Sequence, residues 1–570
     1  MRRDGVGLLL VWVASQVSSA NALTPLTLST DSPFHHHHGW LAVSARSGNK
    51  GKDAGSLVHV ASSLEQDATG QRAIAMTSAS SGLLSVGAMA LSVALLLLCV
   101  VLMIMCLRIA SQSKDATQIT VAPVARFSQG AMDSFNTSEE GQRLLWCLFF
   151  IALFYLWPYQ TCTQSQNYLV DKFPEESGKV GFVMLMCTTW PLLLTHGVSS
   201  LTGFTRWLSY EFKIIVPSCL MALASIYLIF VLLFSEDRPL ILMSLYGIGL
   251  LSGIAESIVE PAIMDVAGLL PSLLTTQQIQ SGTGACGIVV SCLMLLTRVA
   301  SNGLGPLQLK ASQNLTIGFI VVMGLTSLAL PTIYVLVVRR STYFTQHVET
   351  STSRTENVGG KDEGTPKSQG DTQQATLQAW CHIWPSFCAV AVLYSTTLAL
   401  WPVIPGSACV ALPAATGEDS TLQSWWYDLI LFSFNLGDFL GKSAQSSLKI
   451  WALSLSPRSQ LLLAIARAIV FAPLILMSSA PQLYDPSIAR WIAWISVFLL
   501  GLSNGWLSSV SFMRAPKVLP AGSSNVVAEQ ASSLMVLGLF LGLSIGSFLG
   551  YALGQTVLVG SLGVCFGSST

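Results

Sequence analysis

Residues 83–107 read LLSVGAMALSVALLLLCVVLMIMCL, about 25 consecutive residues without a charged side chain. A helix of roughly 20 apolar residues crosses a hydrocarbon core of about 30 Å, so this stretch predicts a membrane-spanning helix. The composition extends the prediction to the whole chain of 570 residues, of which 52% are hydrophobic and only 10% are charged. Soluble domains carry about 25% charged residues. The sequence therefore indicates an all-α, polytopic membrane protein.

The chain before this helix has two parts. Residues 23–81 are polar and aperiodic and predict a solvated, non-cytosolic segment, in which the histidines at 35–38 have no partner cluster that would make a metal site. Residues 1–22 combine a basic start, a short apolar core and small residues, which are the zones of a cleaved signal peptide. A short uncleaved anchor is the alternative interpretation.

Eleven further apolar segments follow a polar stretch, residues 108–143, that we expect to be a cytosolic linker. They lie near residues 144–166, 180–200, 213–234, 239–264, 279–299, 315–338, 383–403, 425–445, 459–478, 490–512 and 530–553. Residues 341–378 are rich in Ser, Thr, Gly, Lys and Glu and predict a disordered cytosolic loop. This loop separates a six-helix half, 144–340, from a five-helix half, 379–555, which a non-cytosolic tail follows at 556–570.

Two patterns describe how the halves relate to each other and to the membrane. The first helix of each half carries Leu-Trp-Pro, at 156–158 and 400–402, and repeated halves are typical of transporters. Lysine and arginine in short loops mark the cytosolic side. If the loop after Arg340 is cytosolic, alternation places the other cation-bearing short loops on the same side and residues 23–81 outside.

Ionisable side chains inside membrane helices are costly and indicate function by default. Asp438 and Lys442 stand four residues apart in the eighth of the eleven segments, which puts them on one helix face. Two interpretations stay open. The two groups form a structural ion pair, or they face a central cavity and bind the hydroxyls of a sugar.

Glu256 and Glu260 repeat this spacing in the fourth segment, where two carboxylates at low dielectric resist ionising together. We expect one of them to be protonated or paired with a cation. Arg467 in the ninth segment is either that cation or a brace of the helix bundle. Arg298 and Arg514 lie near predicted helix ends, where we expect their side chains to snorkel to the membrane surface.

Glycine patterns predict helix packing. Gly282, Gly284 and Gly287 match G-x-G-x-x-G, but without a preceding strand the motif predicts close helix approach and no dinucleotide site. Glycines at every fourth residue from Gly538 to Gly554 predict a smooth ridge on the last helix, which packs within the bundle or between subunits.

Several classes of function are disfavoured. A formal net charge of zero lacks the basic excess of nucleic-acid binders. The cysteines show no short Cys-x-x-Cys spacing, so we expect neither a metal site nor a cofactor. A membrane-embedded hydrolase or transferase is the alternative from another class, but the chain contains no H-E-x-x-H motif, and we expect that it is not an enzyme.

Four stretches resemble the equilibrative nucleoside transporter family. They are FNLGDFLGK at 434–442, which is similar to the F-N-x-x-D-x-x-G-R signature of the eighth helix, IAR at 465–467 with FAPL at 471–474, AGLLP at 267–271 followed by SG at 281–282, and SNG at 503–505 with PKV at 516–518. They occur in family order over about residues 145–555. The resemblance implies an eleven-helix carrier of major-facilitator-like architecture, split six and five, to which this chain adds one N-terminal helix.

The resemblance also implies a substrate site. In the family, an aspartate and an arginine of the eighth-helix signature contact the ribose, a first-helix tryptophan lies against the substrate and a fourth-helix glutamine faces the base. The matching residues here are Asp438, Lys442, Tyr159 and Glu260, and Arg467 joins them as a candidate. Lys442 lacks the two-pronged guanidinium, Tyr159 adds a hydroxyl, and Glu260 replaces an amide with a titratable group.

The implied function is transport of nucleosides or nucleobases, with purines favoured, by alternating access in the plasma membrane. Transport is either facilitative or coupled to protons, and Glu260 leaves this choice open. A transporter of the same fold for another small polar solute, such as a sugar or an amino acid, is the alternative. The expected partners are the substrate, the lipid bilayer and, in the coupled case, protons.

Overall fold

The computed structural model describes residues 129–173, 177–202, 208–270, 274–302, 309–345, 369–401, 420–444, 455–479, 486–515, 518–520, 523 and 525–557. Within these ranges the chain forms helices and short connections, and no β-strand occurs. The predicted signal peptide, the polar segment at 23–81, the extra helix at 83–107 and nearly all of the tail at 556–570 lie outside the described residues.

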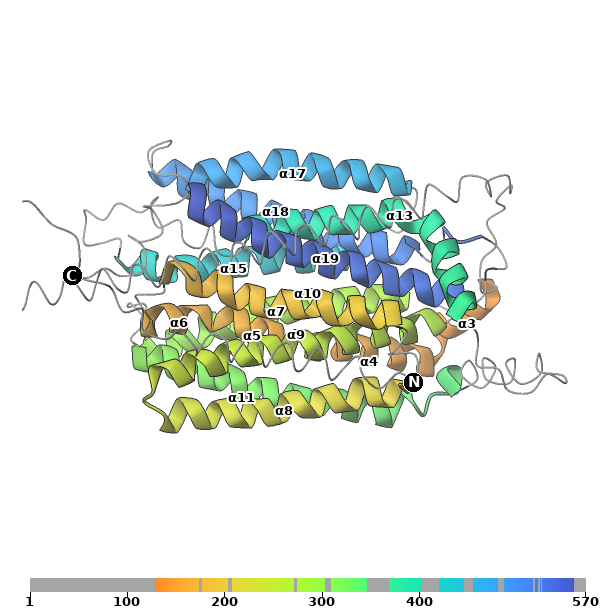
Figure 1. Cartoon of the computed structure of the whole chain (residues 1–570), viewed down its shortest axis with the longest axis horizontal. Coiled ribbons are helices and arrows are strands. Elements are labelled where there is room, and N and C mark those ends of the chain that lie inside the picture. The colour runs from red at the N-terminus through yellow and green to blue at the C-terminus, as the bar shows by residue number, and fades with distance from the viewer. Residues whose placement is uncertain are drawn as a thin grey trace, which may run out of the picture. The chain divides into compact units, whose positions relative to one another are not determined.

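The long helices of the described residues lie side by side with their axes roughly aligned (Figure 1). The N-terminal half contains α3 (Gln129–Thr137), α4 (Glu139–Tyr155), α5 (Trp157–Gln164), α6 (Gln166–Lys172), α7 (Ser177–Thr202), α8 (Tyr210–Phe234), α9 (Arg238–Leu269), α10 (Leu274–Asn302), α11 (Leu309–Ile333) and the π-helical turn η4 (Tyr334–Val338). The C-terminal half contains α13 (Gln369–Leu400), α15 (Ser420–Ser443), α17 (Pro457–Ser479), α18 (Pro486–Arg514) and α19 (Asn525–Val557). Two boundaries differ from the sequence prediction, because α3 begins inside the predicted linker and α13 begins inside the predicted loop.

Ten spans among the described residues are long and apolar enough to cross a membrane, which supports a multi-pass membrane protein. They correspond to ten of the eleven predicted segments. The remaining segment, α15, is a helix of 24 residues but contains Asp428, Asp438 and Lys442. Two of these charged residues, Asp438 and Lys442, are candidate site residues.

Helix α8 illustrates how these sequences form lipid-facing helices. Its N-cap, Ser209, accepts a hydrogen bond from the Phe212 amide at 3.2 Å, which satisfies one donor of the first turn. Leu223, Ile226 and Phe230, on its outer side, are each about two-thirds exposed. A large exposed apolar face of this kind matches hydrocarbon rather than water.

Helices α15 and α18 pack through a glycine contact that positions Asp438. A Cβ atom on Gly437 would lie 2.3 Å from the Phe498 carbonyl oxygen, and one on Gly505 would lie 2.1 Å from the Asp438 carbonyl oxygen. Gly441 and Gly501 make equivalent approaches one turn away on each helix, so both helices present small residues four positions apart. The two backbones therefore touch where the eighth-helix signature lies.

The two predicted glycine patterns are both packing surfaces. Added Cβ atoms at Gly538, Gly542 and Gly546 would meet α13 atoms at 2.6 to 3.1 Å, so the ridge packs within the bundle. A Cβ atom on Gly282 would lie 2.3 Å from the Phe149 carbonyl oxygen of α4. Helix packing is thus the role of the G-x-G-x-x-G match, as predicted.

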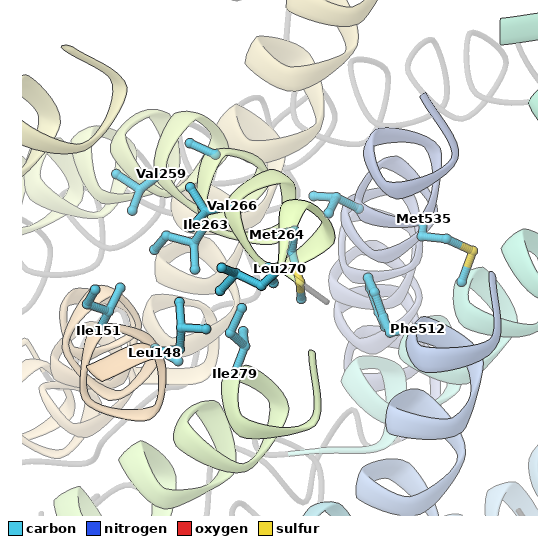
Figure 2. Close-up of a cluster of buried hydrophobic side chains, with 14 of the residues drawn as sticks. Leu148, Ile151, Val259, Ile263, Met264, Val266, Leu270, Ile279, Phe512 and Met535 are labelled. Atoms are coloured by element: carbon cyan, nitrogen blue, oxygen red, sulfur yellow. The ribbon is translucent and has the colours of Figure 1, made fainter. Parts of the chain in front are cut away.

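The two halves meet along α7 with α19 and along α10 with α15. At the end where the predicted cytosolic loops lie, the join is apolar. Figure 2 shows Met264 of α9 and Leu270, the residue that follows this helix, on the side toward Phe512 of α18, with Met535 of α19 beyond it. These side chains belong to one buried cluster, which closes this end of the interface between the halves.

Candidate functional site

Asp438 and Lys442 form a buried ion pair on α15, with 2.8 Å between a carboxylate oxygen and Nζ. The other Asp438 oxygen accepts a hydrogen bond from Asn504 Nδ2 of α18 at 2.8 Å. Lys442 Nζ also donates to Thr283 Oγ1 of α10 at 3.1 Å. The pair therefore links two helices of the C-terminal half to one helix of the N-terminal half.

Helices α10 and α15 are joined by three polar contacts, which we call the α10–α15 seam. Lys442 contacts Thr283 near one end, and Asn435 Nδ2 donates to Ser291 Oγ at 2.7 Å in the middle. At the other end, a buried ion pair joins Arg298 to Asp428. The contacting residues recur every seven or eight positions along each helix, so all three contacts lie along one face of α10 and one face of α15. The two helices run antiparallel.

The Arg298 prediction is wrong. We expected this guanidinium to snorkel, but only 1% of its side chain is exposed. The Cζ atom of the Arg298 guanidinium lies 4.4 Å from the centre of the Trp425 ring. Trp425 lies one turn before Asp428 on α15. Sequence reasoning missed Asp428, and the ion pair removes the need for Arg298 to reach the surface.

Arg467 is bound within the C-terminal half. Its Nε donates to Ser503 Oγ at 2.8 Å, and its terminal nitrogens donate to Thr397 Oγ1 at 2.8 Å and to two backbone carbonyls. Thr397 in turn contacts Asn504 Oδ1, the residue that holds Asp438. Of the two roles considered for Arg467, these contacts favour the brace, because they join α17 to α13 and α18.

Glu256 and Glu260 are 7% and 4% exposed on α9. Among the described residues neither glutamate forms an ion pair, and the cation with an electrostatic influence on Glu260 is Lys442 of α15. The Tyr155 hydroxyl of α4 also lies near both carboxylates without a hydrogen bond of normal geometry. Glu260 and the Asp438–Lys442 pair therefore approach one region from opposite halves.

Tyr159 lies on α5 in a small buried cluster with Leu185 of α7 and Leu398 of α13. It therefore sits between the halves, as a substrate-contacting aromatic would. Beside it, Gln160 Oε1 and both amide atoms of Gln164 are buried without a hydrogen-bond partner. Sequence reasoning missed these amides, whose four-residue spacing within an apolar segment was the available signal.

No group of three or more metal-ligating His, Cys, Asp or Glu side chains occurs in the part of the chain that the structure describes. The polar atoms that are available near the interface are carboxylate, ammonium, amide and hydroxyl groups. Such groups bind hydroxyls and the edges of heterocycles by hydrogen bonds. The arrangement can bind a small polar solute.

A family model described as "Nucleoside transporter" matches residues 247–554. The "Equilibrative nucleotide transporter 8" of Arabidopsis thaliana is 29% identical over 315 residues, which are 54% of this chain and 69% of that protein. The "Equilibrative nucleoside transporter 4" of Homo sapiens is 32% identical over 177 residues, which are 30% of this chain and 28% of that protein. A solved D-xylose-proton symporter aligns over 73% of this chain and 90% of its own, with a TM-score of 0.47 and 12% identity.

Proposed function

This chain belongs to the nucleoside transporter family, and on that premise we propose that it carries nucleosides or nucleobases across a membrane by alternating access. The observation that carries the proposal is the placement of the Asp438–Lys442 pair. It lies on α15, contacts α10 of the other half through Thr283, and is buried among membrane-length helices. Carriers of this type bind their substrate between two halves near the bilayer midplane.

The proposed substrate contacts come from both halves of the molecule. Asp438 accepts hydrogen bonds from the ribose hydroxyls and Lys442 donates to the sugar, while Tyr159 packs on the base and Glu260 reads its edge. The unpaired amides of Gln160 and Gln164 supply further donors and acceptors next to Tyr159. A buried amide without a partner is costly, and a bound solute would remove that cost.

Alternating access requires contacts that close each end in turn. The α10–α15 seam ends in the Arg298–Asp428 ion pair on the predicted outer side. On the predicted cytosolic side, the apolar cluster of Figure 2 joins α9 to α18 and α19. We propose that the outer pair separates when the carrier opens outward and that the apolar cluster separates when it opens inward.

Purine preference and proton coupling are further parts of the proposal, and both rest on Glu260. An ionised carboxylate only accepts hydrogen bonds, whereas a protonated one both donates and accepts. Protonation of Glu260 would therefore change which bases it fits. A proton bound there during the transport cycle would couple transport to the proton gradient. We place this activity at the plasma membrane.

Membership in a family of carriers favours transport over the membrane-enzyme alternative. The chain does contain G-x-S-x-G at Gly501–Gly505, a pattern found at the nucleophile of some hydrolases. That chemistry needs a strained turn between a strand and a helix. Here the motif lies inside α18, and Ser503 is hydrogen-bonded to Arg467 and to the Leu500 carbonyl.

A carrier of the same architecture for another small polar solute remains the second candidate, because Lys442 and Glu260 both depart from the family pattern. The test is uptake of radiolabelled adenosine, inosine, uridine, hypoxanthine, glucose and an amino acid into a transport-deficient host. We expect saturable nucleoside or nucleobase uptake that unlabelled purine nucleosides inhibit. Uptake of glucose or the amino acid alone would overturn the proposal.

A further inference from the structure

A small cavity in the N-terminal half has a lining that includes neither Asp438 nor Lys442. It has a volume of about 20 Å³, is lined by residues of α4, α5, α8, α9 and α11, and is partly open. A void of roughly 10–15 Å³ already holds one water molecule. The cavity therefore accepts one ligand of about that size and excludes a nucleoside.

The polar lining of this cavity is built from oxygen atoms. Glu256 of α9 supplies a carboxylate, and hydroxyls come from Tyr155 of α4, Ser218 of α8, Ser252 of α9 and Ser327 of α11. The Ser252 hydroxyl is buried and has no hydrogen-bond partner, and the buried Tyr155 hydroxyl beside Glu260 makes no hydrogen bond of normal geometry. Both hydroxyls are therefore free to bind one small ligand in the cavity.

A proline residue adds a backbone acceptor to the same lining. Pro331 of α11 has no N–H to donate to the Ser327 carbonyl four residues earlier, and Ser327 lines the cavity. The donor set is thus one carboxylate, several hydroxyls and one carbonyl released from helical bonding.

The charge of the cavity is not balanced by the protein. Among the described residues, no lysine or arginine forms an ion pair with Glu256, and Lys442 acts on Glu260 instead. A buried carboxylate without a counter-charge is strongly disfavoured, so Glu256 binds either a proton or a cation. One bound monovalent cation would leave the site neutral, whereas a divalent ion would leave an uncompensated positive charge.

We propose that this cavity binds one dehydrated monovalent cation of the size of sodium, held by Glu256, Tyr155 and Ser252. Oxygen-only donor sets suit hard cations such as sodium. All five helices that line the cavity belong to the N-terminal half, so the ion would stabilise that half whichever solute the carrier moves. The proposal is therefore independent of the substrate.

The test measures thermal unfolding of the purified full-length protein in detergent, at fixed pH and ionic strength, as sodium replaces N-methylglucamine. We expect the melting temperature to rise with sodium and to saturate, because a ligand that binds only the folded state stabilises it by mass action. Potassium, which is larger, should give no comparable rise. Ser252→Ala should require a higher sodium concentration for the same rise, and Glu256→Gln should abolish it.

Ser257→Ala is the matched control. Ser257 is a buried serine of the same helix whose hydroxyl donates to the Ile254 carbonyl and does not line the cavity. It should keep the full sodium response. An unchanged sodium response in both Ser252→Ala and Glu256→Gln would overturn the site. A melting temperature that responds to pH but not to sodium would assign the cavity to a proton and would also overturn it.

Discussion

Arg298 of α10 and Asp428 of α15 form a fully buried ion pair between the two halves of the molecule. Trp425 covers the guanidinium, so the pair is shielded on one side by an aromatic ring. Removing one partner of a buried pair costs about 3–5 kcal/mol, because the other charge is left uncompensated. We expect Arg298→Gln and Asp428→Asn each to lower the melting temperature and the yield of folded protein.

The exchanged double variant, Arg298→Asp with Asp428→Arg, should recover part of that loss if the two side chains act on each other. A double-mutant cycle on the melting temperature, with Arg298→Gln, Asp428→Asn and the variant that combines these two substitutions, measures this coupling. Additive losses in the cycle would show that the pair contributes no coupling across the interface. Surface variants of Arg339 and Glu211, whose ion pair is largely exposed, provide the control and should change stability by under about 1 kcal/mol.

The Asp438–Lys442 pair carries the second prediction. In Asp438→Asn the amide oxygen can still accept from Asn504, but the negative charge that holds Lys442 and accepts from ribose is lost. We expect nucleoside uptake to fall at least about tenfold, which corresponds to about 1.4 kcal/mol. Cell-surface labelling should show the protein still present, and Lys442→Arg should retain or raise uptake. Uptake at the normal rate in Asp438→Asn would place the sugar site elsewhere.

Glu260 carries a prediction about pH. The groups around it are Glu256 on its own helix, Tyr155 on α4, Lys442 on α15 and Tyr394 on α13. At low pH a protonated Glu260 donates to adenine N1 and accepts from its amino group. At high pH the carboxylate only accepts, which suits the N1–H of hypoxanthine. The ratio of adenosine to inosine uptake should therefore fall as pH rises from about 5.5 to 8, a range that perturbed carboxylates can reach.

Glu260→Gln is the variant that separates this effect from the general pH dependence of the carrier. Its amide donates and accepts at every pH, so the uptake ratio should stay flat. If wild type and Glu260→Gln show the same pH profile and the same ratio of adenosine to inosine uptake, Glu260 neither contacts the base nor binds a proton during transport.

The sequence predicted those features that depend on residues within a single helix. Apolar runs of membrane length predicted ten of the spans, and the spacing of Asp438 and Lys442 predicted that they share a helix face. It was uninformative where the partner lies on another helix. Asp428 is 130 residues from Arg298, and Asn504 is 66 residues from Asp438. No local sequence pattern predicts contacts between residues so far apart in the chain. For this reason the snorkelling prediction for Arg298 was wrong.

The same limit applies to Gly437 of α15 and Gly505 of α18, whose role in helix packing was not predicted from the sequence. Gly437 and Gly505 each lie against the backbone of the other helix, where an added methyl group would overlap a carbonyl oxygen. Gly505→Ala should force α18 away from α15 and separate Asn504 from Asp438. Overpacking of this kind costs about 1–3 kcal/mol, and more where backbone must move. We expect a lower melting temperature and reduced uptake. Gly318→Ala on α11 is the matched control, because nothing lies within 4 Å of its added Cβ atom. If both alanine variants behave alike, close approach of α15 and α18 is not what positions Asp438.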